Sequence, residues 1–151
     1  MDALRVHCQW QRAQTHAPKQ CGQRWPAGVC DGDSVTWAGV LAQCCAVVVT
    51  PRAHNPTGVS LSAARARKLR AVMARYPHVL VITDDHFSLV AATDYHDVIP
   101  PTAMRWALIR SVSKMLGPDL RFAIVASDEQ TAQRLRLRLA PGTNWVSHLL
   151  Q

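Results

Sequence analysis

The amino-acid sequence predicts an α/β fold with a mixed sheet, in which most strands are parallel and one is antiparallel. Three observations support this class. Short β-branched runs recur from residue 46 onward, an amphipathic stretch separates the first two runs, and the last two runs are too close together for a parallel crossover. The composition agrees, because 151 residues of which 48% are apolar suit one ordinary globular domain.

The first strand is predicted at Val47–Thr50 and the second at Val79–Thr83, with a helix between them. Ser62 is the expected N-cap of this helix, which continues to Arg75. The apolar residues of its inner face are Leu69, Val72, Met73 and Tyr76. The order strand, helix, strand implies a right-handed parallel βαβ unit.

The third and fourth strands are predicted at 106–109 and 122–125, and their short connection makes them an antiparallel pair. Asp128 is the expected N-cap of a last helix that ends near Leu139. The alternation of arginine and leucine over residues 134–139 also has the period of a strand. We favour the helix and keep the strand as the alternative.

Residues 1–45 differ from the rest of the chain in composition and hydrophobic pattern. They contain all five cysteines and no sustained period of 2 or 3.6, so we divide the chain into this segment of unclear character and a domain at 46–151. One hypothesis is that residues 1–45 are not translated in the native frame, and the alternative is a genuine extension. The odd number of cysteines and the lack of metal-ligand spacing predict free thiols.

The net charge of +7 comes mostly from arginines in two amphipathic stretches, 65–75 and 134–138. Solvated helix faces explain this charge, and a nucleic-acid surface is the alternative, although interleaved aromatic residues and a known binding motif are missing. Residues 1–20 have no apolar signal region, and no later window approaches the ~20 apolar residues of a membrane helix. We expect a cytoplasmic protein with no membrane partner.

Residues that can carry chemistry follow the predicted strands in order. They are Asn55, Asp84, His86, Ser111, Ser113, Lys114 and Arg121. Open α/β sheets bind ligands at the carboxyl ends of their strands, so an amide, a carboxylate, an amine and a guanidinium are expected to converge there. Asp85 is expected to point away from Asp84, because side chains alternate along a strand.

Each of these residue types suits a pyridoxal-phosphate pocket. A lysine amine can form a Schiff base, a carboxylate can keep a pyridine nitrogen protonated, an amide can donate to a phenolic oxygen, and an arginine fork with serine hydroxyls suits a phosphate. Taken singly, each residue also has an ordinary structural explanation as an exposed loop lysine, a turn aspartate, a turn asparagine or a surface arginine. Their shared order favours the pocket.

The segments 55–58, 84–86 and 111–114, followed by Arg121, resemble the large domain of fold-type I pyridoxal-phosphate aminotransferases of class I and II. Within that superfamily, the sequence is most similar to MocR-type regulators, particularly the PtsJ type. These are GntR-like transcription factors with an aminotransferase-like sensor domain. The resemblance covers residues 46–151 and implies a partial three-layer αβα large domain.

The resemblance implies that Lys114 holds pyridoxal 5'-phosphate as a Schiff base, that Asp84 binds its pyridine nitrogen and that Asn55 binds its phenolic oxygen. The implied phosphate ligands are Ser111, Ser113 and Arg121. His86 stands where the family usually has a tyrosine that also reaches the phenolic oxygen. An imidazole can donate there, and a partly solvated histidine without a role is the alternative.

Two functions fit this resemblance. The first is a fragment of a MocR-type transcriptional regulator that senses a B6 vitamer, and the second is a fragment of a catalytic class I/II aminotransferase in which Lys114 also moves a proton. The implied partners are an amino acid or B6 vitamer, a second subunit, and DNA through a winged-helix domain not found here. The glycine-rich phosphate loop and the small domain of the family are also not found, so we expect weak or no catalysis.

Overall fold

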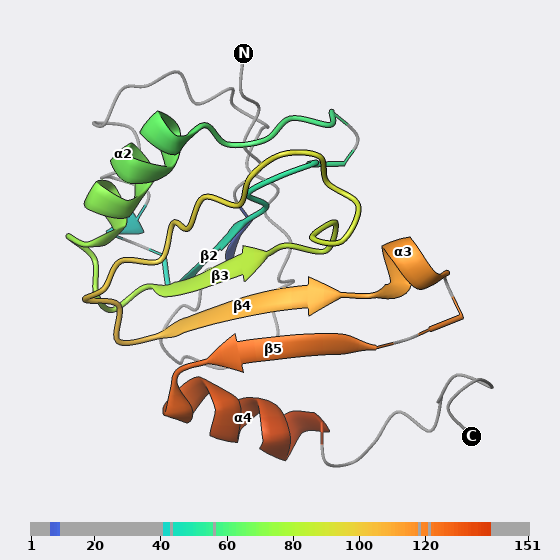
Figure 1. Ribbon diagram of the computed structural model, residues 1–151. Coiled ribbons are helices and arrows are strands. Elements are labelled where there is room, and N and C mark those ends of the chain that lie inside the picture. The colour runs from blue at the N-terminus through green and yellow to red at the C-terminus, as the bar shows by residue number, and fades with distance from the viewer. Residues whose placement is uncertain are drawn as a thin grey trace.

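The computed structural model describes residues 7–9, 41–42, 44–55, 57–117, 119–120 and 122–139, which form a mixed five-stranded sheet with helices (Figure 1). The strands are β1 (His7–Gln9), β2 (Ala46–Val49), β3 (Leu80–Asp84), β4 (Trp106–Ser111) and β5 (Ala123–Ser127). The helices are α2 (Ala63–Met73), α3 (Ser113–Leu116) and α4 (Glu129–Leu139). Along the sheet, the strands lie in the order β1-β2-β3-β4-β5.

Strand pairing confirms the mixed α/β class. β2 pairs parallel to β3, and β3 pairs parallel to β4. β5 pairs antiparallel to β4, as the short connection between them predicts. β1 adds an antiparallel neighbour to β2 that the sequence pattern did not indicate, because three residues are too few to show a strand period.

Helix α2 forms where the N-cap signal predicts it. The Ser62 hydroxyl accepts a hydrogen bond from the Arg65 backbone N–H at 3.2 Å, which satisfies one of the free donors at the helix start. Its inner face packs against the strands, and Val72 and Tyr76 are partly buried beside it. The core consists of Leu41, Val47, Val49, Leu61, Ala66, Leu69, Met73, Val79, Val81 and Val98. The predicted apolar face of this helix is therefore confirmed.

Asp128 connects the start of α4 to the sheet. One of its carboxylate oxygens accepts from the Thr131 N–H at 2.9 Å, and the other accepts from the Trp106 N–H at 2.8 Å. Partial burial works to raise the pKa of Asp128, but these hydrogen bonds outweigh it and hold the pKa below its usual value. The helix interpretation of 134–139 is confirmed and the strand alternative is wrong, because this cap starts a continuous helix to Leu139.

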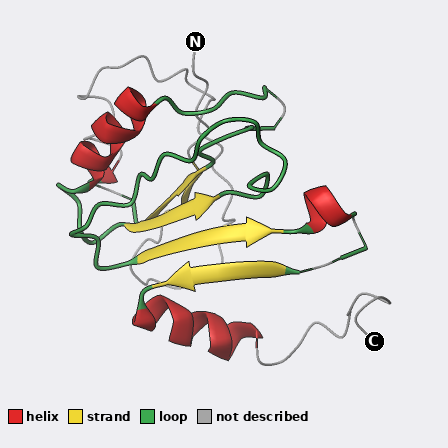
Figure 2. Cartoon of the chain, viewed as in Figure 1, coloured by secondary structure: helices red, strands yellow, loops and turns green. Residues whose placement is uncertain are grey.

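The carboxyl ends of β3 and β4 point the same way in Figure 1, and α3 follows β4 at that end. The link from β3 to β4 runs without a helix, as Figure 2 shows. No described helix is long and apolar enough to cross a membrane.

Cys44 is disulfide-bonded, so the prediction of free thiols is wrong at this position. A disulfide depends on how closely two cysteines approach in the folded chain, which their spacing in the sequence does not reveal.

Candidate functional site

Six of the seven candidate residues lie at or just after the carboxyl ends of three adjacent strands. Asn55 lies in the turn after β2, Asp84 ends β3 with His86 just beyond it, and Ser111 ends β4. Ser113 and Lys114 begin α3. Arg121 lies outside the described residues.

His86 and Lys114 both contact Phe87, and Asp84 lies beside His86. The His86 Nδ1 lies 3.3 Å from Oδ2 of Asp84, within ion-pair distance, although it has no hydrogen-bond partner among the described residues. The His86 ring contacts the Phe87 ring with centroids 4.5 Å apart. The Lys114 Nζ lies 5.5 Å from the centroid of the same Phe87 ring, which is a cation-π distance. The structure therefore gathers a carboxylate, an imidazole and an amine.

Two hydroxyls lie at the start of α3. The Oγ atoms of Ser111 and Ser113 are 2.9 Å apart, and the Ser113 N–H donates to the Ser111 Oγ at 3.3 Å. The Val112 N–H donates to the Phe122 carbonyl at 3.2 Å, which ties this segment to the chain before β5. The hydroxyl pair and the lysine therefore lie within four residues, from the last residue of β4 to the first turn of α3.

Asn55 lies in a hydrogen-bonded turn. The His54 N–H donates to the Val59 carbonyl at 2.9 Å, and Gly58 has a φ of +71°, a value that favours glycine. The Asn55 side chain is exposed. Of the hydrogen bonds between described residues, none joins it to Asp84, His86 or Lys114. The structure places Asn55 at the same end of the sheet but does not bring it into this contact group.

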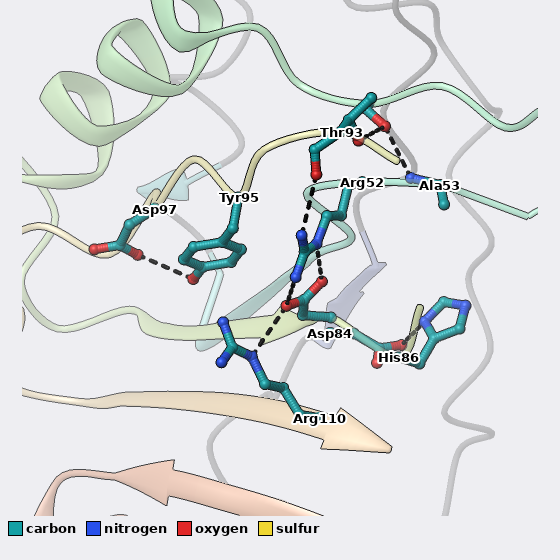
Figure 3. Close-up of polar contacts among 10 residues, drawn as sticks. Arg52, Ala53, Asp84, His86, Thr93, Tyr95, Asp97 and Arg110 are labelled. Carbon is teal, nitrogen blue, oxygen red and sulfur yellow. Dashed lines mark hydrogen bonds and ion pairs between the residues drawn. The ribbon is translucent and has the colours of Figure 1, made fainter. Parts of the chain in front are cut away.

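Asp85 is fully buried and paired with two arginines, whereas the Asp84 side chain is 37% exposed. The Arg52 guanidinium donates to both Asp85 oxygens, at 2.7 and 2.9 Å, and the Arg110 Nε donates at 3.1 Å. Figure 3 labels the two arginines. The pKa of Arg52 is raised, first by its hydrogen bond to Asp85 and against the effect of burial. Asp84 and Asp85 thus have opposite environments, as strand alternation predicts.

Tyr95 packs against both guanidinium groups. Its ring centroid lies 5.6 Å from Cζ of Arg52 and 5.3 Å from Cζ of Arg110, and its hydroxyl donates to Oδ1 of Asp97 at 3.3 Å. In Figure 3 Tyr95 lies to the left of Arg52, and His86 lies to the right of it. Sequence spacing does not indicate this group, because Arg52 and Arg110 are 33 and 25 positions from Asp85.

The Tyr95 hydroxyl predicts a loss of stability at alkaline pH. Burial, assisted by the negative charge of Asp97, raises the pKa of Tyr95 to about 12 from 10.0. A raised folded-state pKa stabilises the fold fully below about pH 10, and this contribution disappears as pH rises toward 12. Two pKa units correspond to about 2.7 kcal/mol, and solvent screening of this half-buried side chain reduces the expected loss to about 1 kcal/mol.

Denaturant unfolding between about pH 9 and 12 measures this loss, and the ultraviolet absorbance of tyrosinate follows the titration itself. Tyr95→Phe is expected to remove the late-titrating group and about 1 kcal/mol of the alkaline loss. Tyr76→Phe is the matched control, because the chain has two tyrosines. A late transition that survives Tyr95→Phe would contradict the assignment.

Comparisons with known proteins show the family of the chain. The family model for aminotransferases of class I and II matches residues 30–151. The vitamin B6 salvage pathway transcriptional repressor PtsJ of Salmonella typhimurium is 63% identical over 106 residues, which are 70% of this chain and 25% of that protein. The chain therefore spans about a quarter of the length of this relative.

Two solved structures share the fold. The aspartate aminotransferase from Rhizobium meliloti superposes with a TM-score of 0.61 at 20% identity, over 76% of this chain and 30% of that chain. A putative aminotransferase with bound pyridoxal phosphate from Clostridium difficile 630 superposes with a TM-score of 0.59 at 16% identity, over 72% of this chain and 30% of that chain. At these identities, the likeness concerns the fold alone.

Proposed function

Because the chain belongs to the family of class I and II aminotransferases, we propose that it binds pyridoxal 5'-phosphate at the carboxyl ends of β2, β3 and β4. The observation that carries this proposal is that His86 and Lys114 both contact the Phe87 ring, while Asp84 lies beside His86. The three groups lie at or just after the carboxyl ends of two adjacent strands, where sheets of this class bind ligands.

The residues present fit such a cofactor by their chemistry. The exposed Lys114 amine can bond to its aldehyde carbon, and the Asp84 carboxylate can pair with its ring nitrogen. His86 and Asn55 would donate to the phenolic oxygen. The proposed phosphate ligands are Ser111, Ser113 and Arg121. When bound, the cofactor supplies an electron-withdrawing ring, while the protein holds and orients it.

We further propose that the parent protein is a cytoplasmic transcriptional regulator of the MocR type that responds to a B6 vitamer. The 63% identity to a repressor of vitamin B6 salvage supports a regulator over an enzyme. In this proposal the parent is a homodimer, and DNA is bound by a separate winged-helix domain. The alternative is a catalytic aminotransferase, supported by the family itself and by the position of Lys114.

Lysine labelling tests cofactor binding. The 151-residue chain is incubated with pyridoxal phosphate, reduced with borohydride, and digested for peptide mass mapping. The chain has three lysines, and the reduced cofactor is expected on Lys114. Lys114→Ala should abolish this label, whereas Lys68→Ala, which removes an exposed lysine of α2, should leave it unchanged. Equal labelling of Lys68 and Lys114 would sink the proposal.

The full-length parent distinguishes the two candidate functions. For a regulator, DNA binding changes when a B6 vitamer is added, and amino-group transfer is absent. For an enzyme, the parent transfers an amino group from an amino acid to a keto acid, and DNA binding is absent. Both assays use the same protein preparation, so that each serves as the activity control of the other.

A further inference from the structure

Arg52, Asp85 and Arg110, called here the charge cluster, connect the carboxyl ends of three adjacent strands. Arg52 follows β2, Asp85 follows β3, and Arg110 lies at the end of β4. Asp85 accepts hydrogen bonds from both arginines and is itself fully buried. One carboxylate therefore holds three chain segments that are far apart in the sequence.

Each member of the charge cluster is close in sequence to a proposed cofactor ligand. Asp85 lies between Asp84 and His86, and Arg110 directly precedes Ser111. Arg52 begins the turn that carries Asn55. Neighbouring side chains of a strand point to opposite faces, so the cluster can hold the backbone from one face while the proposed ligands use the other. The buried Asp85 beside the partly exposed Asp84 shows this arrangement.

The two arginines differ in exposure. The Arg52 side chain is 11% exposed and binds Asp85 through two nitrogens, whereas the Arg110 side chain is 47% exposed and binds through Nε. A half-exposed ion pair adds little to stability. Arg110 nevertheless packs against Tyr95 at 5.3 Å and joins β4 to the buried carboxylate. Its main effect is therefore on geometry.

Building on the cofactor-binding function proposed above, we propose that Arg110, acting through Asp85, is a positioning residue for Asp84, His86 and Ser111. Through the hydrogen bond to Asp85, Arg110 fixes the end of β4 relative to the end of β3. Asp84 and Ser111 adjoin these two anchored positions, and both are proposed to touch the cofactor. Loss of Arg110 should leave the fold in place and disturb the spacing of its ligands.

Arg110→Gln tests this role. We expect this variant to bind pyridoxal phosphate about tenfold more weakly, the size of effect seen when a residue that orients metal ligands is removed. The visible absorbance of the lysine-bound cofactor should also shift, a readout that a purely structural role would not move. Arg110→Lys keeps the charge and should recover part of the affinity. Arg67→Gln, on the exposed face of α2, is the matched control and should bind like the wild type.

The outcomes separate this inference from the proposed function. If the wild type binds the cofactor and Arg110→Gln binds equally well, the positioning role is wrong and the proposed function stands. If the wild type does not bind, the proposed function fails. Backbone hydrogen exchange then still tests whether Arg110 anchors the strand ends. Faster exchange at the Asp85 and Val112 amides in Arg110→Gln would support anchoring of the strand ends, and unchanged exchange would overturn it.

Discussion

Replacing Asp85 by asparagine is expected to lower the free energy of unfolding by about 3 kcal/mol, because it leaves two guanidinium groups without their shared counter-charge. Asp85 is fully buried and accepts three hydrogen bonds from Arg52 and Arg110. Asparagine has nearly the same volume, so the loss reflects charge and hydrogen bonding rather than a cavity. Urea unfolding followed by circular dichroism should show a lower midpoint with an unchanged slope.

Two further variants make this measurement specific. Asp94→Asn removes an exposed carboxylate of the same loop region and is expected to change stability by less than about 0.5 kcal/mol. Adding Arg52→Gln to Asp85→Asn should cost much less than the sum of the two single changes, because both remove the same interaction. An Asp85→Asn variant as stable as the Asp94→Asn control would show that the charge cluster does not stabilise the fold.

The elements that could be predicted from sequence are those decided by local patterns. The β-branched runs gave β2 to β5, and the side chains of Ser62 and Asp128 cap α2 and α4 where the sequence places the caps. The antiparallel pairing of β5 followed from the length of its connection. β1 could not be predicted, because its three residues show no period and its pairing with β2 is a tertiary contact.

In the candidate site, too, local patterns predict some features and tertiary contacts decide the others. Strand order placed Asp84, Ser111 and Lys114 at one end of the sheet, and the family resemblance drawn from these motifs is confirmed by the family model and by the match to PtsJ. The role of Phe87 as the contact between His86 and Lys114 could not be predicted, because ring packing depends on the tertiary fold.

The charge cluster lies at the limit of what the sequence reveals. Alternation predicts that Asp85 faces the opposite side from Asp84, and its complete burial agrees with this. A buried carboxylate requires a cationic partner, so the existence of such a partner for Asp85 could have been predicted. Which of the fourteen arginines would supply it could not be read from spacings of 33 and 25 residues.

Asp84→Asn is expected to weaken pyridoxal phosphate binding by roughly 10- to 100-fold, the equivalent of about 1.5–3 kcal/mol for a hydrogen bond to a charged group. An amide can still accept a hydrogen bond, but it carries no charge to keep a ring nitrogen protonated. The stability of the protein should change little, because the Asp84 side chain is 37% exposed and its contact with His86 is 3.3 Å long.

A cofactor titration followed by visible absorbance measures this affinity, and urea unfolding of the same samples measures stability. Asp85→Asn should differ by its large loss of stability, and because it also breaks the hydrogen bond from Arg110 it should weaken binding about as much as Arg110→Gln, so the change in stability distinguishes the two adjacent aspartates. If Asp84→Asn binds as tightly as the wild type while Lys114 is still labelled, the ring nitrogen has another partner. Binding at the carboxyl ends of the strands would then stand, but the cofactor would have to be oriented differently from the arrangement proposed for Asp84.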